Sequence, residues 1–138
     1  MLIFSDISII KSHLSKLKKE GNIIGFIPTM GALHNGHLSL IKKSISENNF
    51  TVVSIFVNPT QFDNSEDLKT YPCNIKNDIS LLKSISDDII LFNPDSQEVY
   101  SEGVQSQQFN FNGLDKYMEG KYRVNHFQGV ATVVNKLL

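Results

Sequence analysis

Short, strongly apolar runs alternate along this chain with segments whose apolar residues recur at helical spacing, and this alternation limits the fold more than any other feature. The apolar runs cover residues 23–27, 51–57 and 89–92, and the helical stripes fall within residues 6–20, 35–45, 75–85 and 127–137. Runs that are apolar at nearly every position are typical of strands buried on both faces of a parallel sheet. The sequence therefore predicts an α/β fold in which helices flank a parallel sheet.

Capping residues mark the ends of several of these helices. Ser5 or Asp6 can cap the first helix, Gly21 can end it, and Asn74 can cap the helix over 75–85. The apolar stripe after residue 35 consists of Leu38, Leu40, Ile41 and Ile45. His13 lies off the stripe of its helix, so we expect it to be solvated.

The remaining segments are polar and give weaker signals. Asp63, Glu66 and Asp67 form an acidic patch that is typical of a solvated loop. Phe109 and Phe111 alternate with polar residues, which indicates an exposed or edge strand within residues 95–113. We expect a short helix over 114–118 and a loop over 119–127. A parallel sheet would have another strand after the last helix, but that helix is predicted to run to the final residue. We therefore expect the sheet to be incomplete at the C-terminus.

The turn over residues 28–37 carries the clearest functional signal. It joins a strand to a helix and contains two histidines, His34 and His37, on either side of Gly36. A helix that begins near Asn35 places both rings on one side of its first turn, beside free backbone N–H groups and the positive end of the helix dipole. This combination suits a phosphate chain. The same spacing is compatible with half of a metal site or with two solvated histidines.

A second polar loop follows the next strand and supplies amide groups. Asn58 and Gln61 lie in the loop over 58–62, although these residues are also compatible with a simple capped turn. The carboxyl ends of parallel strands meet at one edge of a sheet, where ligands bind in α/β folds. We therefore expect the rings of His34 and His37 and the amide of Gln61 to face one crevice.

Composition excludes several classes of protein. The formal charge of −1 gives no reason to expect nucleic acid or an acidic membrane surface as a partner. The single cysteine, Cys73, excludes an internal disulfide framework and fits a reducing compartment. We find neither an apolar stretch of membrane-spanning length nor a signal peptide. We expect one cytoplasmic domain, or part of one, that binds neither nucleic acid nor membrane.

Four segments carry a more specific pattern: GFIPTMGALHNGH at 25–37, VVSIFVNPTQF at 52–62, EDLKTYP at 66–72 and EGKYRVNHFQGVATVVNKLL at 119–138. Together they resemble the pantothenate synthetase (pantoate–β-alanine ligase) family of the HxGH nucleotidyltransferase superfamily. The His-x-Gly-His pattern alone marks only the superfamily, whereas the four segments in this order are highly specific. The resemblance implies a Rossmann-like parallel sheet with flanking helices, of the nucleotidyltransferase type.

The resemblance also implies a reaction and a set of site residues. Pantoate is adenylated by ATP, which brings Mg²⁺, and the amine of β-alanine then displaces AMP from pantoyl adenylate. His37 is implied as the catalytic histidine or proton donor, with His34 beside it. The implied ATP site consists of Met30, Gly31, Ala32, Leu33, His34, Asn35, Gly36 and His37. The implied pantoate and β-alanine site consists of Gln61, Pro28, Thr29, Asn58, Tyr71, Arg123 and His126. The resemblance also implies that the protein is a homodimer and that it holds no tightly bound metal ion of its own.

Some features depart from the family pattern. Cys73 stands where the family commonly has arginine, and Val124 replaces a common proline. The family enzymes continue into further phosphate-binding segments and a small C-terminal lid domain. We therefore expect residues 1–138 to form the N-terminal nucleotide- and pantoate-binding domain, with little activity alone.

Three rival interpretations remain open at this stage. The nearest is another nucleotidyltransferase of the same superfamily, against which Gln61 argues. A non-catalytic nucleotide-binding or assembly module is the second. A metal-dependent hydrolase that uses His34, His37 and His126 is the weakest.

Overall fold

The computed structural model describes residues 1–62, 65–101, 107–108, 110, 116 and 126–138. The chain divides into two compact units. Unit 1 comprises Met1–Phe56 and Pro72–Asp95, and unit 2 comprises Val57–Tyr71 and Ser96–Leu138.

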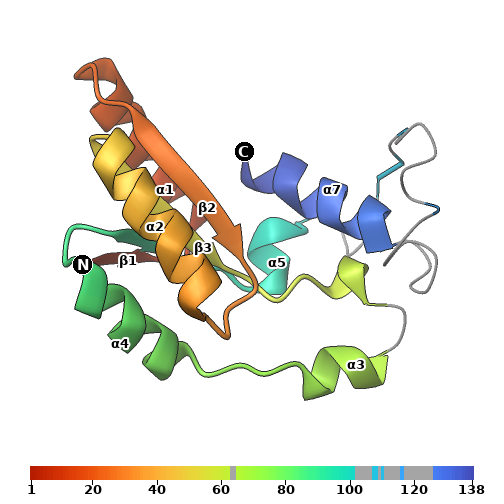
Figure 1. Ribbon diagram of the computed structural model, residues 1–138. Helices are drawn as coiled ribbons and strands as arrows, with labels where there is room; N and C mark the ends of the chain where they lie inside the picture. The colour runs from red at the N-terminus through yellow and green to blue at the C-terminus, as the bar shows by residue number, and fades with distance from the viewer. Residues whose placement is uncertain (63–64, 102–106, 109, 111–115, 117–125) are drawn as a thin grey trace. The chain divides into compact units, whose positions relative to one another are not determined.

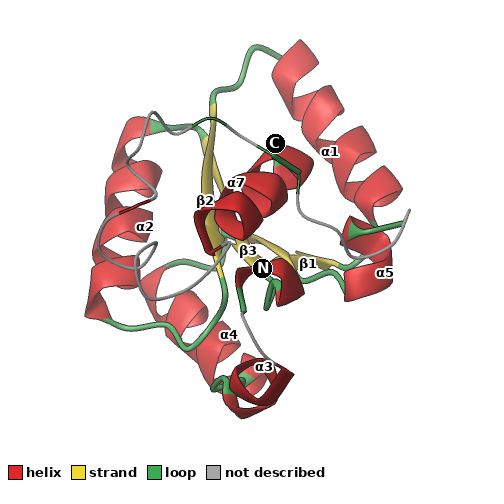
Figure 2. Cartoon of the chain, turned by 90° about the vertical axis from the view of Figure 1, so that its right-hand side faces the viewer, coloured by secondary structure: helices red, strands yellow, loops and turns green. Residues whose placement is uncertain are grey.

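Unit 1 is a parallel sheet with helices on both faces. Its strands are β1 (Leu2–Phe4), β2 (Ile24–Thr29), β3 (Phe50–Ile55) and β4 (Ile90–Phe92), in the spatial order β1-β4-β3-β2. Each pairing between these strands is parallel, with Ile27 opposite Val53 and Val53 opposite Leu91. Figure 2 shows α1 (Ile7–Lys19) on one side of the sheet and α2 (Asn35–Glu47) and α4 (Ile75–Ile85) on the other. The predicted α/β class is confirmed.

The predicted helix ends of unit 1 are also confirmed. Asp6 caps α1 by accepting the Ile9 N–H at 3.0 Å, and Asn74 caps α4 by accepting the Asn77 N–H at 3.1 Å. Gly21 follows α1 with a φ of +86°, a conformation that favours glycine. His13 differs from expectation, because its ring lies 5.3 Å from the ring of Phe4.

The core of unit 1 lies between the sheet and the α2–α4 face. Ile41, Val53, Leu82 and Leu91 are fully buried there, with Leu33 and Ile55 beside them. The stripe predicted for α2 was partly wrong, since Ile41 is buried whereas Leu40 is 58% exposed. Leu40 is adjacent to Ile41 in sequence and therefore points to a different side of the helix.

Two strands differ from prediction. The run at 23–27 was expected to be buried on both faces, but β2 stands at the edge of the sheet and Ile23 is 63% exposed. The strand also continues through Pro28 and Thr29, because an edge strand tolerates a residue without an N–H group. Strand β1 was not predicted; it has three residues and exposes half of Leu2 and Ile3.

Unit 2 contains η1 (Pro59–Gln61), α3 (Ser65–Thr70), α5 (Ser96–Val99) and α7 (His126–Leu137). Helix α7 packs against η1 and α5 (Figure 1). A Cβ atom added at Gly129 would lie 2.2 Å from the carbonyl oxygen of Thr60, so only glycine allows this approach. The final predicted helix is confirmed.

Other predictions for unit 2 were wrong or fall outside the described residues. Residues 65–70 form a helix instead of a solvated loop, with Glu66 and Asp67 in its first turn. Residues 96–99 are also helical. The predictions that concern Phe109, Phe111 and residues 111–115 and 117–125 lie outside the part of the chain that the structure describes. Within the described residues, we find no helix that is long and apolar enough to cross a membrane.

Candidate active site

The turn between β2 and α2 is held by side-chain hydrogen bonds. The Thr29 hydroxyl donates to the Ser54 carbonyl oxygen at 2.8 Å and accepts the Gly31 N–H at 3.2 Å. Gly31 and Ala32 both have positive φ, at +81° and +50°. A non-glycine residue in this region is uncommon and needs support from its surroundings.

A buried carboxylate from α4 supplies that support. Asp78 is 1% exposed, and its two oxygens accept the N–H groups of Ala32 at 3.0 Å and Leu33 at 2.8 Å. The side chain of Leu33 enters the core, so the turn is held on both sides. This arrangement fixes the backbone immediately before His34.

His34 and His37, which we call the histidine pair, cap α2 with their rings. The Nδ1 atom of His34 accepts the Gly36 N–H at 3.1 Å, and Nδ1 of His37 accepts the His34 N–H at 3.3 Å. The ring centroids are 4.1 Å apart. The predicted helix start at Asn35 is confirmed, but these two backbone N–H groups are not free for an anion as the sequence suggested.

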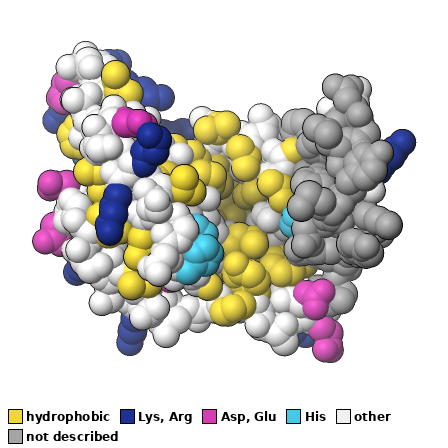
Figure 3. Space-filling model, viewed as in Figure 1, with side chains coloured by type: hydrophobic (Ala, Val, Ile, Leu, Met, Phe, Trp, Pro, Cys, Tyr) yellow, Lys and Arg dark blue, Asp and Glu magenta, His cyan; other side chains and the backbone are white. Residues whose placement is uncertain are grey.

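The caps determine which nitrogen of each neutral ring carries the proton. A nitrogen that accepts an N–H bond carries no proton, so each neutral ring holds its proton on Nε2. Histidine side chains reach the surface of the molecule (cyan in Figure 3); His34 is exposed and His37 is half-buried. The pair can therefore donate hydrogen bonds through two Nε2–H groups.

The charge state of His37 follows from its surroundings. Burial lowers the pKa of His37, and the neighbouring His34 ring lowers it further, whereas the carboxylate of Asp78 raises it. The net direction is downward, so the ring is neutral near pH 7 and acts as a hydrogen-bond donor.

Unit 2 contains a polar cluster made of Asn58, Thr60, Gln61 and Tyr100, which we call the amide cluster; all of its members except Thr60 are buried. Asn58 is fully buried, and its Nδ2 donates to Oε1 of Gln61 at 2.9 Å and to the Gly129 carbonyl oxygen at 3.0 Å. Its Oδ1 accepts from the Thr60 hydroxyl at 2.9 Å and from the Tyr100 hydroxyl. These bonds fix the orientation of the Asn58 amide and, through it, the carbonyl end of Gln61.

Two more predicted site residues belong to unit 2. His126 borders the amide cluster, because its Nδ1 lies 3.2 Å from the main-chain carbonyl oxygen of Gln61. Tyr71 packs against Phe62, and their rings form a T-shaped pair with centroids 5.5 Å apart. Burial raises the pKa of Tyr100, although its hydrogen bond with Thr60 acts in the opposite direction, so the hydroxyl keeps its proton.

A family profile described as pantoate-beta-alanine ligase matches residues 2–138 of this chain. The chain belongs to the pantoate-beta-alanine ligase family. A pantothenate synthetase from Christiangramia forsetii is 47% identical over 99% of this chain and 48% of that protein. One from Francisella tularensis subsp. novicida is 48% identical over the whole chain and 52% of that protein.

Solved structures agree with this family assignment. The pantoate-beta-alanine ligase of Francisella tularensis, complexed with beta-gamma ATP and beta-alanine, superimposes with a TM-score of 0.90 at 46% identity. It matches the whole of this chain and 52% of that chain. A pantothenate synthetase from Thermus thermophilus gives a TM-score of 0.80 at 38% identity over 99% of this chain and 48% of that one. The chain thus spans about half the length of the relatives it matches.

The turn predicted to bind the nucleotide lies in unit 1. The turn joins Pro28, Thr29, Met30, Gly31, Ala32 and Leu33 to the histidine pair, with Asn35 and Gly36 in the first turn of α2. The hydroxyl of Thr29 and the side chain of Leu33 are occupied inside the turn and the core. Asn58, Gln61, Tyr71 and His126 belong to unit 2, and Arg123 lies outside the described residues. The crevice shared by the histidine pair and Gln61 stays a prediction.

Sequence reasoning missed two residues that hold these parts of the site, Asp78 and Tyr100. Asp78 had a signal, because it interrupts the apolar stripe of α4 between Ile75 and Leu82. A charged residue on the buried face of a helix needs a partner. Tyr100 had no such signal, since its contact with Asn58 joins residues that are 42 positions apart.

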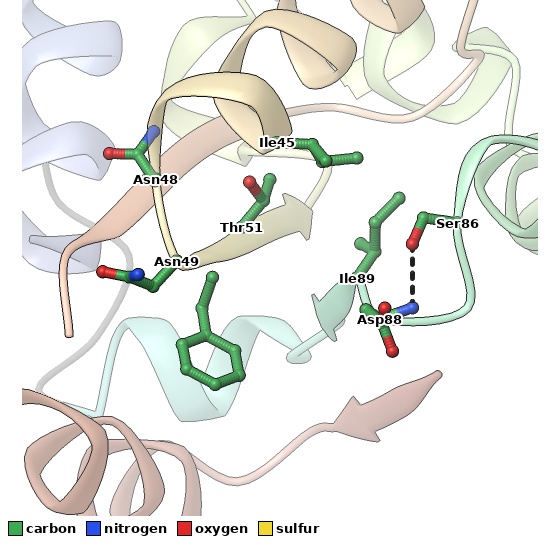
Figure 4. Close-up of a pocket in the computed structure, with 8 residues that line it drawn as sticks. Ile45, Asn48, Asn49, Thr51, Ser86, Asp88 and Ile89 are labelled. Atoms are coloured by element: carbon green, nitrogen blue, oxygen red, sulfur yellow. Dashed lines mark hydrogen bonds between the residues drawn. The ribbon is translucent and has the colours of Figure 1, made fainter. Parts of the chain in front are cut away.

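A separate hollow of about 90 Å³ lies at the amino ends of β3 and β4, away from the histidine turn. Figure 4 shows its lining, which includes Asn49, Ser86 and Asp88. Asn49 accepts the Ile23 N–H at 2.8 Å, and Ser86 accepts the Asp88 N–H at 3.1 Å. These side chains close loops, and we assign the hollow no ligand. Among the described residues, no group of three or more His, Cys, Asp or Glu side chains is arranged to hold a metal ion.

Proposed function

We propose that the protein to which this chain belongs joins pantoate to β-alanine at the expense of ATP, and that residues 1–138 form its N-terminal nucleotide- and pantoate-binding domain. The observation that carries the proposal is the histidine pair, which caps α2 through Nδ1 and so presents two Nε2–H donors. Family membership and the ATP and β-alanine named for the Francisella tularensis structure support it.

The first step is an adenylation. A pantoate carboxylate oxygen attacks the α-phosphorus of ATP. The bond between the α-phosphorus and the oxygen that bridges to the β-phosphate breaks, and pyrophosphate leaves. Mg²⁺ enters with ATP as part of the substrate. Negative charge grows on the phosphate oxygens, and hydrogen-bond donors that are already oriented stabilise it without reorganisation. His34 and His37 would fill this role, with residues 30–33, Asn35 and Gly36 lining the nucleotide.

The second step is an amide synthesis. The amine of β-alanine attacks the carbonyl carbon of pantoyl adenylate, AMP leaves with the electron pair of the broken bond, and the nitrogen loses a proton. Nδ2 of Asn58 donates to Oε1 of Gln61 and so orients the Gln61 side chain, which we propose contacts pantoate. His126, Tyr71, Pro28 and Thr29 are proposed to surround the same substrates, together with Arg123. We further propose a cytoplasmic homodimer.

Binding calorimetry tests the proposal on this chain. We expect ATP with Mg²⁺, and separately pantoate, to bind the wild-type chain. His37→Ala removes the ring with its Nε2–H donor and should weaken ATP binding about tenfold or more, since a hydrogen bond to a charged group contributes roughly 1.5–3 kcal/mol. His13→Ala, outside the turn, is the matched control. Binding of ATP without pantoate would favour another nucleotidyltransferase, and loss of ATP affinity in both variants would contradict the assignment of the histidine pair.

A further inference from the structure

Asp78 is a buried charged residue that the reaction proposed above does not use. It is 1% exposed and stands on α4, 45 residues from the turn that it contacts. Burying a carboxylate is unfavourable unless hydrogen bonds replace the lost water. Here the replacements are the N–H groups of Ala32 and Leu33, one on each oxygen. The carboxylate therefore binds the backbone of the histidine turn directly.

The turn needs this contact because its backbone is strained. Gly31 and Ala32 are consecutive residues with positive φ, and Ala32 has a side chain that disfavours this region. Residues held in such conformations persist when surrounding contacts over-determine them. Contact at Gly31 is also close, since a Cβ atom there would lie 2.9 Å from Oδ2 of Asp78. The carboxylate of Asp78 therefore packs closely against both residues of positive φ, Gly31 and Ala32.

Residues 31–33, which Asp78 holds, immediately precede the histidine pair. Leu33, whose N–H is bound by Asp78, is followed by the N-cap residue His34. The position of His34 sets the cap on Gly36 and the N–H that His37 accepts. A shift of residues 32–33 would therefore move both rings. The negative charge of Asp78 also acts on His37, where it opposes the effects of burial and of His34 on the pKa.

We propose that Asp78 is a positioning residue for the nucleotide site, which holds residues 31–33 so that both histidine rings present Nε2 to the phosphate chain. This inference rests on the proposed function for the identity of the ligand. Asp78 acts through the backbone and is not a catalytic residue. Asn and Asp differ here in a specific way, because an Asn amide offers one acceptor and turns a donor NH₂ group toward the second N–H.

The test compares the wild-type chain with Asp78→Asn, and with Asp87→Asn as the control for removing an exposed carboxylate of unit 1. Amide hydrogen exchange and the NMR titration of His37 are measured first, without nucleotide. We expect protected Ala32 and Leu33 amides in the wild type and the control. In Asp78→Asn we expect these amides to exchange at least about tenfold faster and the pKa of His37 to fall further.

ATP affinity is the second measurement. Asp78→Asn should weaken ATP binding about tenfold, the equivalent of one hydrogen bond to a charged group, and Asp87→Asn should leave it unchanged. Unprotected Ala32 and Leu33 amides in the wild type would overturn the inference even if Asp78→Asn failed to fold. An unchanged His37 pKa together with unchanged ATP affinity in Asp78→Asn would also overturn it. A wild-type chain that binds no ATP would count against the proposed function, while exchange and titration still decide the role of Asp78.

Discussion

At the scale of single residues, imidazole nitrogen does the work that serine or aspartate oxygen usually does at a helix start. His34 and His37 each accept a backbone N–H through Nδ1, so the cap exists only while Nδ1 is unprotonated. The same ring atoms that could bind a proton thus hold the first turn of α2. This dual use links the order of the helix start to pH.

The stability of the chain should therefore depend on pH through His37. The folded pKa of His37 is lowered, chiefly by burial, relative to about 6.5 for an exposed histidine. Between these two values the unfolded chain binds more protons, so the free energy of unfolding rises with pH in that window. The contribution of His37 to stability is fully present above the pKa that the ring has in the unfolded chain. It is lost once the pH falls below the pKa of the ring in the folded chain.

Urea unfolding at a series of pH values measures this effect. The increase in the free energy of unfolding with pH should be smaller in His37→Gln, which has no ring to titrate. The same increase should be retained in His13→Gln. An NMR titration that gave His37 a pKa above that of an exposed histidine would contradict the prediction.

A second residue-scale prediction concerns Tyr100. Its hydroxyl donates to Asn58, which is fully buried and orients Gln61. Tyr100→Phe removes only that hydroxyl and should lower the free energy of unfolding by about 1 kcal/mol or more, since a buried acceptor loses a donor. Ser80→Ala, which removes an exposed hydroxyl, is the control and should change stability by less than about 0.5 kcal/mol. Equal effects of the two variants in urea unfolding would show that the contact contributes nothing.

At the scale of elements, close approach decides more than intrinsic propensity. Gly129 lies within α7, where glycine is a poor helix former, yet its Cα faces the backbone of η1. The contact between α7 and η1 joins segments about seventy residues apart, as the bond from Asn58 to the Gly129 carbonyl shows. The two effects of an added methyl group therefore have opposite signs.

The variant Gly129→Ala shows which effect is larger, the gain in helix propensity or the clash of the added Cβ atom with Thr60. Helix propensity alone predicts stabilisation by about 1 kcal/mol, whereas a Cβ atom 2.2 Å from the Thr60 oxygen predicts a loss of about 1–3 kcal/mol through overpacking. We expect the loss, measured as a lower denaturation midpoint. Gly21→Ala is a useful comparison, because a Cβ there meets nothing within 4 Å and only the positive φ opposes it. A stabilised Gly129→Ala variant would show that α7 does not pack against η1 as described.

The elements also show how far sequence reasoning extends. Periodicity located α1, α2, α4 and α7, because each has an apolar stripe, and a recognisable capping residue also marked the start of α1 and of α4. Such signals are local. By contrast, β1 is three residues long and half-exposed, so it lacks a run that could be distinguished. The turn sequence identified the histidine pair, but the contact between Asp78 and Leu33 depends on how two βα segments pack, which no local pattern contains.

At the scale of the whole molecule, the chain corresponds to about half of its relatives. If adenylation also needs cations from the other half of the relatives' length, turnover by this chain should be lower by on the order of 10³-fold or more. The measurement is AMP release from ATP with pantoate and β-alanine, with the full-length Francisella tularensis ligase assayed in parallel. Comparable rates for the two proteins would contradict this prediction.

The position of Pro28 has a consequence for self-association. Among the described strands β2 closes one flank of the sheet, and an unpaired flank of parallel backbone is a template on which foreign chains can add. Proline offers no hydrogen to such an incoming chain, so the exposed ladder is interrupted just before the turn between β2 and α2. We therefore expect Pro28 to oppose fibrillar growth on this flank.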